Sequence, residues 1–381
     1  MDHRKSALAA WARHCLAEGG LEEKGGAKLL PRLAQAEVET VSGDASFRRY
    51  FRIRLASSSW VLVDAPPAHE DCHRFVKIAR LFREAGLLTP RVLAVDYEQG
   101  FMLLEDFGDT LYLPTLLQSR AVNDDNADQL YTAAMAALIE LQANGKSSEL
   151  APYDRKLLRT ELSLFDNWFC ERFLGLTLND EEKALLDRTW TFLEDAALAQ
   201  VPVCVHRDYH SRNLMIIGGD LRHAPGVIDF QDAVVGACTY DLVSLLRDCY
   251  IVWPQERVRE WALQFRSAAV KRGILSDDDV STAESFLRDF DLMGLQRHIK
   301  VIGIFCRLHL RDGKPRYMAD VPLVIGYVLR VAAQHPEMSE FMQWFQSKVL
   351  PLAQRKLKAY AVETDVVAAD ALEADAIKEV P

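Results

Sequence analysis

A histidine, an arginine and an aspartate occupy positions 206 to 208, and Asn213 follows five residues after Asp208. This spacing is a catalytic-loop signature of phosphoryl transfer. In that chemistry the aspartate accepts the proton of the hydroxyl that is phosphorylated. The asparagine turns its amide oxygen to a Mg²⁺ ion on the ATP phosphates. The spacing therefore predicts Asp208 as the catalytic residue and Asn213 as a metal ligand.

A second carboxylate follows the loop at the distance of one hairpin. The apolar run 214–217 leads to Gly218 and Gly219, and a second apolar run ends at Asp229. A hairpin of this kind returns its last residue to the catalytic loop. Mg²⁺ is held in such sites by one or two oxygen ligands together with substrate phosphates. We therefore predict that Asp229 completes the metal site with Asn213.

The triplet Asp106-Phe107-Gly108 resembles the metal-binding triplet of protein kinases, but it lies ahead of the catalytic loop. It directly follows the apolar run FMLLE, where the strand-rich part of the chain ends. We expect the backbone of Glu105, Asp106 and Phe107 to bind the adenine edge of the nucleotide. The side chain of Asp106 is then expected to face solvent or the lobe junction rather than the metal.

The predicted secondary structure around these residues changes along the chain from mainly strands to mainly helices. Apolar alternation and turn residues predict strands over 38–41, 47–55 and 60–67, and two more within 91–107 around a Glu-Gln-Gly turn. Helical spacing predicts an amphipathic N-terminal helix with Leu8, Trp11 and Cys15 on one face. It also predicts helices over 70–86, 128–144, 160–175, 181–199, 255–272, 279–310 and 339–360.

These elements predict an α+β, protein-kinase-like fold of two lobes. Residues 1–105 are expected to form a small β-rich lobe that binds the nucleotide. Residues 106–360 are expected to form a larger helical lobe with the catalytic loop, the metal site and the acceptor site. Residues 361–381 are acidic and rich in Ala and Val, and we expect a mobile tail there.

Composition argues against several other classes of protein. The formal net charge of -10 provides no chain-wide basic surface, which argues against nucleic acid as the main ligand. The seven cysteines are scattered and include no C-x-x-C pair, which argues against a zinc ribbon. The N-terminus lacks the apolar region of a signal peptide, and no stretch reaches the ~18 apolar residues of a membrane span. We expect a cytoplasmic monomer without a membrane partner.

At its motifs the sequence resembles the aminoglycoside phosphotransferase family of small-molecule kinases. Four stretches look like the anomeric kinases of N-acetylmuramate and N-acetylglucosamine in bacterial cell-wall recycling: SGDASFRRYFR (42–52), VLVDAPP (61–67), LLEDFGD (103–109) and HRDYHSRNLM (206–215). The resemblance covers about residues 25–350. It implies ATP, Mg²⁺ and an amino-sugar acceptor, with phosphate transfer to the anomeric hydroxyl. It also implies that Asp241 opens a helix and braces the catalytic loop.

The sequence departs from the general kinase pattern at the phosphates. The phosphate loop retains only Gly43, with the hydroxyls of Ser42 and Ser46 as further phosphate contacts.

The third strand also lacks its lysine and has Asp64 near that position. Strand alternation puts Arg49 on the apolar face of residues 47–53, where a charge needs a partner. We expect Arg49 to contact phosphate, with Arg48 as the second choice. An Arg49–Asp64 pair is the structural alternative.

The acceptor residues are less defined by the sequence. The lactyl carboxylate of N-acetylmuramate favours a nearby cation, and a sugar ring favours an aromatic side chain. The cationic candidates are His210, Arg212, Arg307 and Arg311. The aromatic candidates are Trp168, Tyr209, Trp253 and Phe305, and Asp232 is a candidate for a sugar hydroxyl. A purely structural role remains the alternative for each of them.

Two other functions remain open at this stage. One is another small-molecule kinase of the same fold, acting on an aminoglycoside, choline or homoserine. The other is a catalytically silent nucleotide-binding regulator, because the expected lysine is missing. The presence of Asp208, Asn213 and Asp229 argues against loss of activity.

Overall fold

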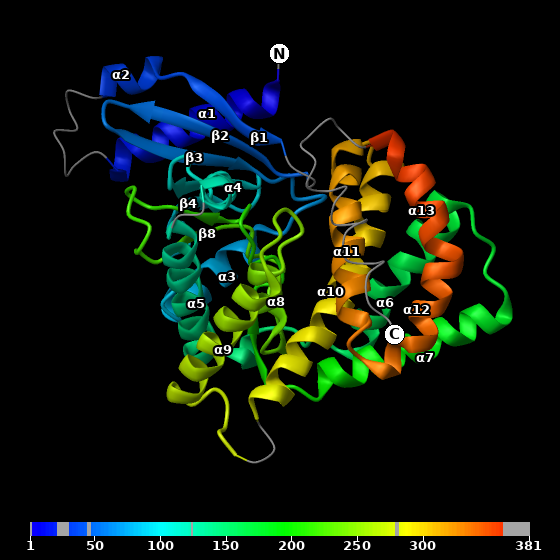
Figure 1. Ribbon diagram of the computed structural model, residues 1–381. Coiled ribbons are helices and arrows are strands. Elements are labelled where there is room, and N and C mark those ends of the chain that lie inside the picture. The colour runs from blue at the N-terminus through cyan, green and yellow to red at the C-terminus, as the bar shows by residue number, and fades with distance from the viewer. Residues whose placement is uncertain (1, 21–29, 44–46, 123–124, 279–281, 361–381) are drawn as a thin grey trace.

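The computed structural model describes residues 2–20, 30–43, 47–122, 125–278 and 282–360. A small sheet with its helices lies on one side of the molecule, and a larger helical body lies on the other (Figure 1). The predictions for Ser46 and for the tail at 361–381 lie outside the described residues, as does the side chain of Ser42. The predicted fold class, a β-rich lobe followed by a helical one, is confirmed.

The N-terminal sheet is antiparallel throughout, with the strand order β1-β2-β3-β5-β4. Its strands are β1 (Val38–Gly43), β2 (Arg49–Leu55), β3 (Ser58–Asp64), β4 (Val92–Asp96) and β5 (Phe101–Glu105). Helix α3 (Cys72–Glu84) connects β3 to β4, and Asp71 caps its N-terminus by accepting a hydrogen bond from the Arg74 N–H. Each predicted strand and the predicted helix are present.

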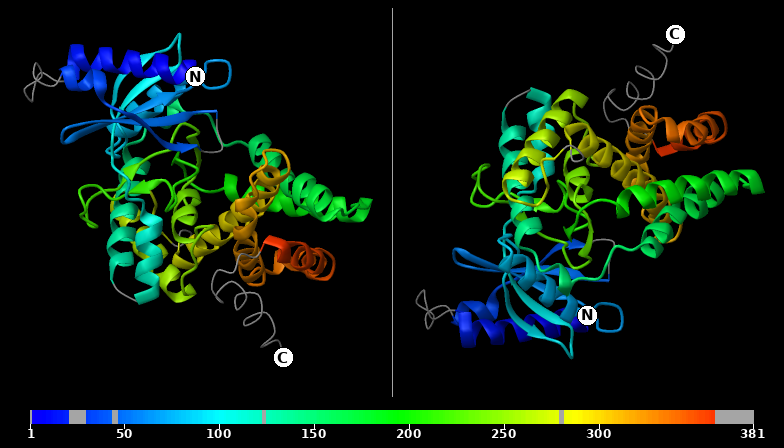
Figure 2. Two further views of the ribbon diagram at one scale, coloured as in Figure 1. Left: turned by 90° about the horizontal axis from the view of Figure 1, so that it is seen from above. Right: turned by 90° about the horizontal axis from the view of Figure 1, so that it is seen from below.

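The two faces of this sheet pack against different partners. Side chains alternate between faces along a strand, and Phe51, Ile53 and Leu62 pack against α1 (His3–Cys15). Seen from above, α1 lies across the sheet (Figure 2). Val63 is on the opposite face and joins the core that contains α3. The sheet therefore has an α1 side and a cleft side, and that distinction decides where its charged residues act.

The predicted long helices of the second lobe are present with shifted ends. They are α5 (Asn126–Asn144), α6 (Arg155–Leu164), α7 (Asp180–Leu198), α9 (Gln255–Lys271) and α10 (Ala283–Leu310). The predicted helix at 160–175 continues from α6 into a π-helix, η5 (Phe165–Leu174). The predicted helix at 339–360 is divided into α12 (Ser339–Trp344), η8 (Phe345–Val349), α13 (Leu350–Leu357) and η9 (Lys358–Tyr360).

Four further helices have no counterpart in the long helices predicted from the sequence: α2 (Leu30–Gln35), α4 (Tyr112–Val122), α8 (Tyr240–Leu246) and α11 (Val321–Ala332). Every residue of α8 is buried, so the sequence has no polar face to reveal helical spacing. Helix α11 is apolar except for Gly326, Tyr327 and Arg330, so it also lacks a clear polar face. Shorter single turns are η1 (Leu16–Gly20), η4 (Ser147–Glu149), η6 (Pro315–Asp320) and η7 (Pro336–Met338).

Helix α10 is the central support of the helical lobe. Its 28 residues correspond to a length of about 42 Å, and it packs against α6, α7, α8, α9 and α11. Gly303 allows a close crossing, because a Cβ atom there would lie 2.3 Å from the Leu164 carbonyl carbon. The same helix also lines the cleft described below.

The catalytic loop is held between two short antiparallel pairs. Strand β6 (Pro202–Val205) pairs with β9 (Val234–Ala237), and β7 (Leu214–Met215) pairs with β8 (Gly226–Val227). Gly218 and Gly219 have φ of 63° and 78°, which allows the turn after β7. In the part of the chain that the structure describes, no helix is long and apolar enough to cross a membrane.

Candidate active site

A cleft of about 1250 Å³ lies between the sheet and the helical lobe. Its walls come from β3, β5, the segment 105–109, the catalytic loop, Asp229 and α10. Pockets for one small ligand are typically about 300–1,000 Å³. The cleft is therefore large enough for a nucleotide and an acceptor together, and it brings Asp208, Asn213 and Asp229 into one wall.

Two buried aspartates fix the backbone of the catalytic loop. Asp241, in the first turn of α8, accepts hydrogen bonds from the His206 N–H (2.6 Å) and the Arg207 N–H (2.9 Å). Burial raises the pKa of Asp241 to about 7, although these two bonds oppose the shift. Asp248 accepts a bond of 3.0 Å from the Ser211 N–H. The bracing role predicted for Asp241 is confirmed.

Two residues at the active centre have left-handed backbone conformations. Arg207 has φ of 80° and Asp229 has φ of 64°. Such a conformation costs a non-glycine residue about 1–3 kcal/mol and persists only where the surroundings enforce it. Here the Asp241 carboxylate binds the Arg207 N–H, and Gln231 donates to Asp229 over 2.9 Å. One strained position therefore directly precedes the predicted catalytic Asp208, and the other is the predicted metal ligand Asp229.

His206 connects the catalytic loop to the strand that carries Asp229. Its Nδ1 accepts from the Asp208 N–H (3.2 Å), and its Nε2 lies 3.1 Å from the Ile228 carbonyl. These contacts require a neutral ring protonated at Nε2. Burial lowers the pKa of His206 to about 4, which keeps the ring neutral at pH 7. The histidine thus positions Asp208 without adding a charge.

The charge around Asp208 favours its ionised form. Burial alone acts to raise the pKa of Asp208. The positive charges of Lys300 and Arg297 on α10, with those of His210 and Arg207, outweigh burial and hold the pKa below its ordinary value. An ionised carboxylate at this position can accept a hydrogen bond from an acceptor hydroxyl and then take its proton.

Asn213 and Asp229 lie next to each other in the wall of the cleft. The Asn213 Nδ2 donates to the Asp208 carbonyl (3.0 Å) and lies 3.5 Å from the Asp229 Oδ2. Both residues line the cleft. The described residues contain no group of three or more His, Cys, Asp or Glu side chains suited to a metal. An amide and a carboxylate nevertheless fit Mg²⁺, which takes few protein ligands beside substrate phosphates.

The segment 105–107 has the features expected of a nucleotide-binding hinge. Within the described chain, nothing accepts a hydrogen bond from the Phe107 N–H. The Asp106 carboxylate lies 2.6 Å from Arg52 and also accepts from the Gly108 N–H. The side chain of Asp106 is therefore occupied at the lobe junction and is not at the metal position. Apolar side chains of this part of the cleft are those of Val61, Leu104, Met215 and Ile228.

The structure corrects the expectation for Arg49. Arg49 pairs across the strands with Asp64, whose Oδ2 accepts from its Nε over 3.0 Å, and it also binds Asp2. Arg4 of α1 binds the same Asp64 carboxylate. These contacts lie on the α1 side of the sheet, because the apolar face of β2 covers α1 rather than the cleft. The structural alternative, an Arg49–Asp64 pair, is the arrangement present.

Arg48 lies on the cleft side of the sheet instead. Its Nε donates to Glu70 over 2.8 Å, and its side chain is 9% exposed. The Asp229 charge acts on the Arg48 guanidinium. Of the two arginines considered from the sequence, Arg48 is therefore the one near the metal and phosphate positions.

The predicted acceptor residues divide into two groups. His210, Arg212, Asp232, Phe305 and Arg307 line the cleft. Arg212 stacks on Tyr250, with the guanidinium carbon 3.5 Å from the ring centroid.

The remaining candidates lie outside the cleft. Tyr209 is fully buried, and its hydroxyl donates to the Ala134 carbonyl over 2.8 Å. Trp253 is a core residue bonded to Tyr131. Trp168 stacks with Arg172, and Arg311 binds Asp312. Their contacts are those of structural residues.

Sequence reasoning missed several side chains of the cleft. Arg297 and Lys300 of α10 line it, as do Tyr250 and Tyr317. The positions 297, 300, 304 and 307 share one face of a helix, and that spacing is visible in the sequence. The missing information was which face of α10 turns toward Asp208.

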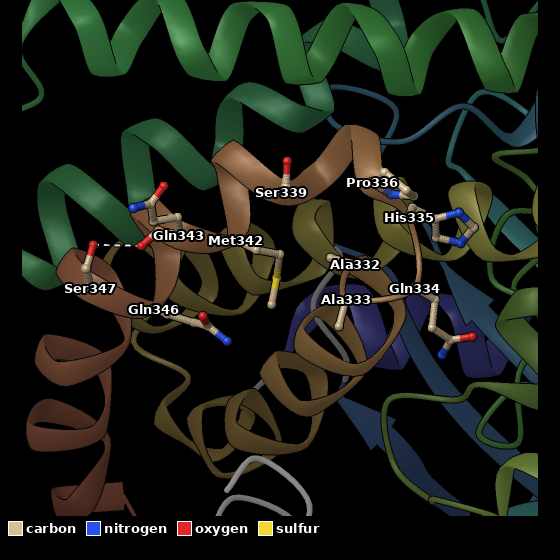
Figure 3. Close-up of a pocket in the computed structure, with 10 residues that line it drawn as sticks. All are labelled: Ala332, Ala333, Gln334, His335, Pro336, Ser339, Met342, Gln343, Gln346 and Ser347. Carbon is tan, nitrogen blue, oxygen red and sulfur yellow. Dashed lines mark hydrogen bonds between the residues drawn. The ribbon is translucent and has the colours of Figure 1, made fainter. Parts of the chain in front are cut away.

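A second hollow of about 630 Å³ lies where α11 ends and α12 begins (Figure 3). The residues that line it include one titratable side chain, His335. Its ring nitrogens are engaged, with Arg288 at 3.2 Å and Asp291 at 3.2 Å. This hollow therefore lacks the groups needed for phosphoryl transfer, and we assign the chemistry to the cleft.

Comparison with known proteins supports the same conclusion. The family described as "Phosphotransferase enzyme family" matches residues 37–274. The N-acetylmuramate/N-acetylglucosamine kinase of Pseudomonas putida is 46% identical over 299 residues, which cover 78% of this chain and 84% of that protein. The protein of the same name from Pseudomonas aeruginosa is 43% identical over 339 residues, covering 89% and 95%.

A solved structure supports the fold independently of sequence. The ethanolamine kinase of Plasmodium vivax superposes with a TM-score of 0.56 at 11% identity, covering 84% of this chain and 88% of that one. At this identity the likeness concerns the arrangement of the two lobes.

Proposed function

Since this chain belongs to the phosphotransferase enzyme family, we propose that it transfers the γ-phosphoryl group of ATP to the anomeric hydroxyl of N-acetylmuramate or N-acetylglucosamine. The observation that carries the choice of acceptor is the 43% identity to a kinase of that name over 95% of its length. The cleft supports the reaction type, because it places a carboxylate, an amide and a second carboxylate in one wall.

In this reaction Asp208 accepts the proton of the anomeric hydroxyl. The hydroxyl oxygen forms a bond to the γ-phosphorus, and the bond from that phosphorus to the bridging oxygen of ADP breaks. The proton on Asp208 passes to solvent after the sugar 1-phosphate leaves. Lys300 and Arg297 keep the carboxylate ionised before the transfer. Most of the rate enhancement then comes from positioning and charge neutralisation.

Asn213 and Asp229 would hold Mg²⁺, which neutralises charge on the β- and γ-phosphates when it is bound. Arg48 is our candidate for the cation that replaces the missing lysine of the third strand. Its support is its position directly before β2, on the cleft side of the sheet, and the effect of the Asp229 charge on its guanidinium. Glu70 fixes its guanidinium in place. Ser42, Gly43 and Ser46 remain predicted phosphate contacts.

The two lobes divide this work. We propose that residues 1–105 bind the nucleotide and that residues 106–360 supply the catalytic loop, the metal ligands and the acceptor site. The backbone of residues 105–107 would contact adenine between the lobes. The use of ATP places the proposed reaction in the cytoplasm, and the cleft of a single chain brings Asp208, Asn213 and Asp229 together.

An acceptor screen tests this proposal. ATP consumption is measured with N-acetylmuramate, N-acetylglucosamine, choline and an aminoglycoside in the presence of Mg²⁺. We expect turnover with at least one of the two amino sugars and none with the other compounds. Turnover with choline or the aminoglycoside alone would reject the acceptor assignment. Binding of ATP without transfer to any of the four would favour a nucleotide-binding regulator.

A further inference from the structure

Arg297 of α10 is a buried cation to which the described residues offer no salt-bridge partner. Its side chain lines the cleft, although the residue is only 3% exposed. Its one hydrogen bond within the described chain goes to the Cys249 Sγ over 3.3 Å, and no described carboxylate forms a salt bridge with it. Burial of a charge without a partner is unfavourable. A side chain of this kind in a cleft requires an anion from the ligand.

The neighbouring charges are already engaged with one another. Glu161 pairs with both Lys300 and Arg207. Asp241 accepts two backbone N–H bonds from the catalytic loop, and Asp248 accepts from Ser211. These contacts leave Asp208 as the remaining acid whose charge acts on Arg297. In the proposed reaction Asp208 must serve the acceptor hydroxyl, so it cannot also neutralise Arg297.

We propose, on the basis of the function proposed above, that Arg297 binds the lactyl carboxylate of N-acetylmuramate and makes this acidic sugar the preferred acceptor. Arg297 and Asp208 line the same cavity, and their opposite charges interact. One sugar can therefore place its anomeric hydroxyl on Asp208 and its carboxylate on Arg297. A guanidinium binds a carboxylate through two parallel hydrogen bonds, which gives direction as well as charge.

Arg307 is the other arginine of α10 that lines the cleft without a described salt bridge. Ten residues of helix separate it from Arg297 by about 15 Å along the axis. It is also absent from the charges that act most strongly on Asp208. Arg297 is therefore the better placed of the two for a carboxylate on the same sugar ring as the reacting hydroxyl.

The test compares two sugars in two proteins. In Arg297→Met we expect kcat/KM for N-acetylmuramate to fall about 10²-fold, the loss of one charged hydrogen-bonded pair. The value for N-acetylglucosamine, which has no carboxylate, should fall at least about 10-fold less, because with that sugar Arg297→Met removes only the effect of the Arg297 charge on Asp208. Arg297→Lys should recover part of the loss, because it keeps the charge but not the two-pronged geometry. Arg311→Met is the control, since Arg311 lies at the end of the same helix and binds Asp312 outside the cleft.

A change in the substrate gives the same test without a variant. The unaltered protein should phosphorylate the carboxamide of N-acetylmuramate about 10²-fold less efficiently than the acid. The Arg297→Met variant should phosphorylate the acid and the carboxamide with the same kcat/KM, because the side chain and the carboxylate are the two members of one interaction.

Equal losses with both sugars in Arg297→Met would overturn the proposal, and so would full activity of the unaltered protein on the carboxamide. Activity on N-acetylglucosamine alone would also reject it while leaving the proposed reaction in place. Absence of turnover with either sugar would instead reject the proposed function.

Discussion

The arginines of the sheet and the arginines of α10 differ in how their charges are neutralised. In the sheet, Arg48 pairs with Glu70, Arg49 with Asp64, and Arg52 with Asp106. On α10, Arg297 and Arg307 face the cleft, and neither forms a salt bridge with a residue that the structure describes. Of these arginines, Arg52, Arg297 and Arg307 line the cleft.

The paired arginines therefore stabilise the fold, whereas the unpaired arginines are available to bind an anionic ligand. A paired guanidinium is fixed by its carboxylate, and removal of either partner leaves an uncompensated charge. An unpaired guanidinium in a cleft gains most when an anion arrives. The residues that look most alike in the sequence therefore have different expected effects when replaced.

The largest effect on activity is expected at Asp208. Asp208→Asn keeps the shape of the side chain but cannot accept the hydroxyl proton. We expect turnover to fall about 10³-fold while the melting temperature and ATP binding stay close to those of the unaltered protein. Turnover near the original value in a folded variant would show that Asp208 is not the base.

The difference between paired and unpaired arginines can be tested by the free energy of unfolding of two variants. Arg52→Met should lower the free energy of unfolding by about 4 kcal/mol, because it leaves the buried Asp106 carboxylate without its partner. Arg307→Met removes a cation that has no described partner, so unfolding stability should be unchanged or higher. Chemical denaturation of both variants measures this. Similar losses in the two variants would remove the distinction between paired and unpaired arginines.

His206 is a buried titratable side chain that stays neutral in the folded protein, unlike the charged arginines compared above. Its pKa of about 4 lies below the ordinary value of 6.5, so between these values the unfolded state binds a proton that the folded state refuses. Stability should fall by up to about 3 kcal/mol as the pH drops from 6.5 toward 4.

Between pH 6.5 and 4, the melting temperature of His206→Asn should fall less steeply with decreasing pH than that of the unaltered protein. The exposed His223 provides the matched control, since His223→Asn should leave the slope unchanged. If the melting temperature of His206→Asn fell as steeply with decreasing pH as that of the unaltered protein, other groups would be responsible for the loss of stability in acid.

The smallest expected effect distinguishes Arg48, which directly precedes β2, from Arg49, the first residue of β2. Arg48→Met should raise KM for ATP about 10-fold, equivalent to about 1.4 kcal/mol, because Arg48 faces the phosphate side. Arg49→Met should change KM for ATP less than about 2-fold, because Arg49 is bound to Asp64 and Asp2 on the α1 side. The reverse order would restore the original expectation for Arg49.

The catalytic loop could be predicted because its chemistry is local. The distances from His206 to Asn213, and through the Gly-Gly turn to Asp229, are set by chain geometry. The strands were equally accessible, since alternation and turn residues mark them. The helices α8 and α11 could not be read from periodicity, because α8 is buried throughout and α11 is almost entirely apolar, so neither has a polar face that reveals helical spacing.

The errors at the site arise from contacts distant in sequence. Alternation separated Arg48 from Arg49 correctly, but nothing local tells which side of β2 meets α1. Tyr209 follows the catalytic residue directly, yet its ring points into the core. Arg297 was missed because its significance depends on its surroundings, and only the folded chain shows that no described carboxylate forms a salt bridge with it.

The position of the phosphate on the product tests the central claim most directly. The enzyme is incubated with ATP, Mg²⁺ and N-acetylmuramate labelled with carbon-13 at C1, and the product is examined by phosphorus NMR. The account predicts a phosphorus signal coupled to the labelled C1, as in a sugar 1-phosphate. A phosphate on the C6 or C4 hydroxyl, without coupling to C1, would contradict it.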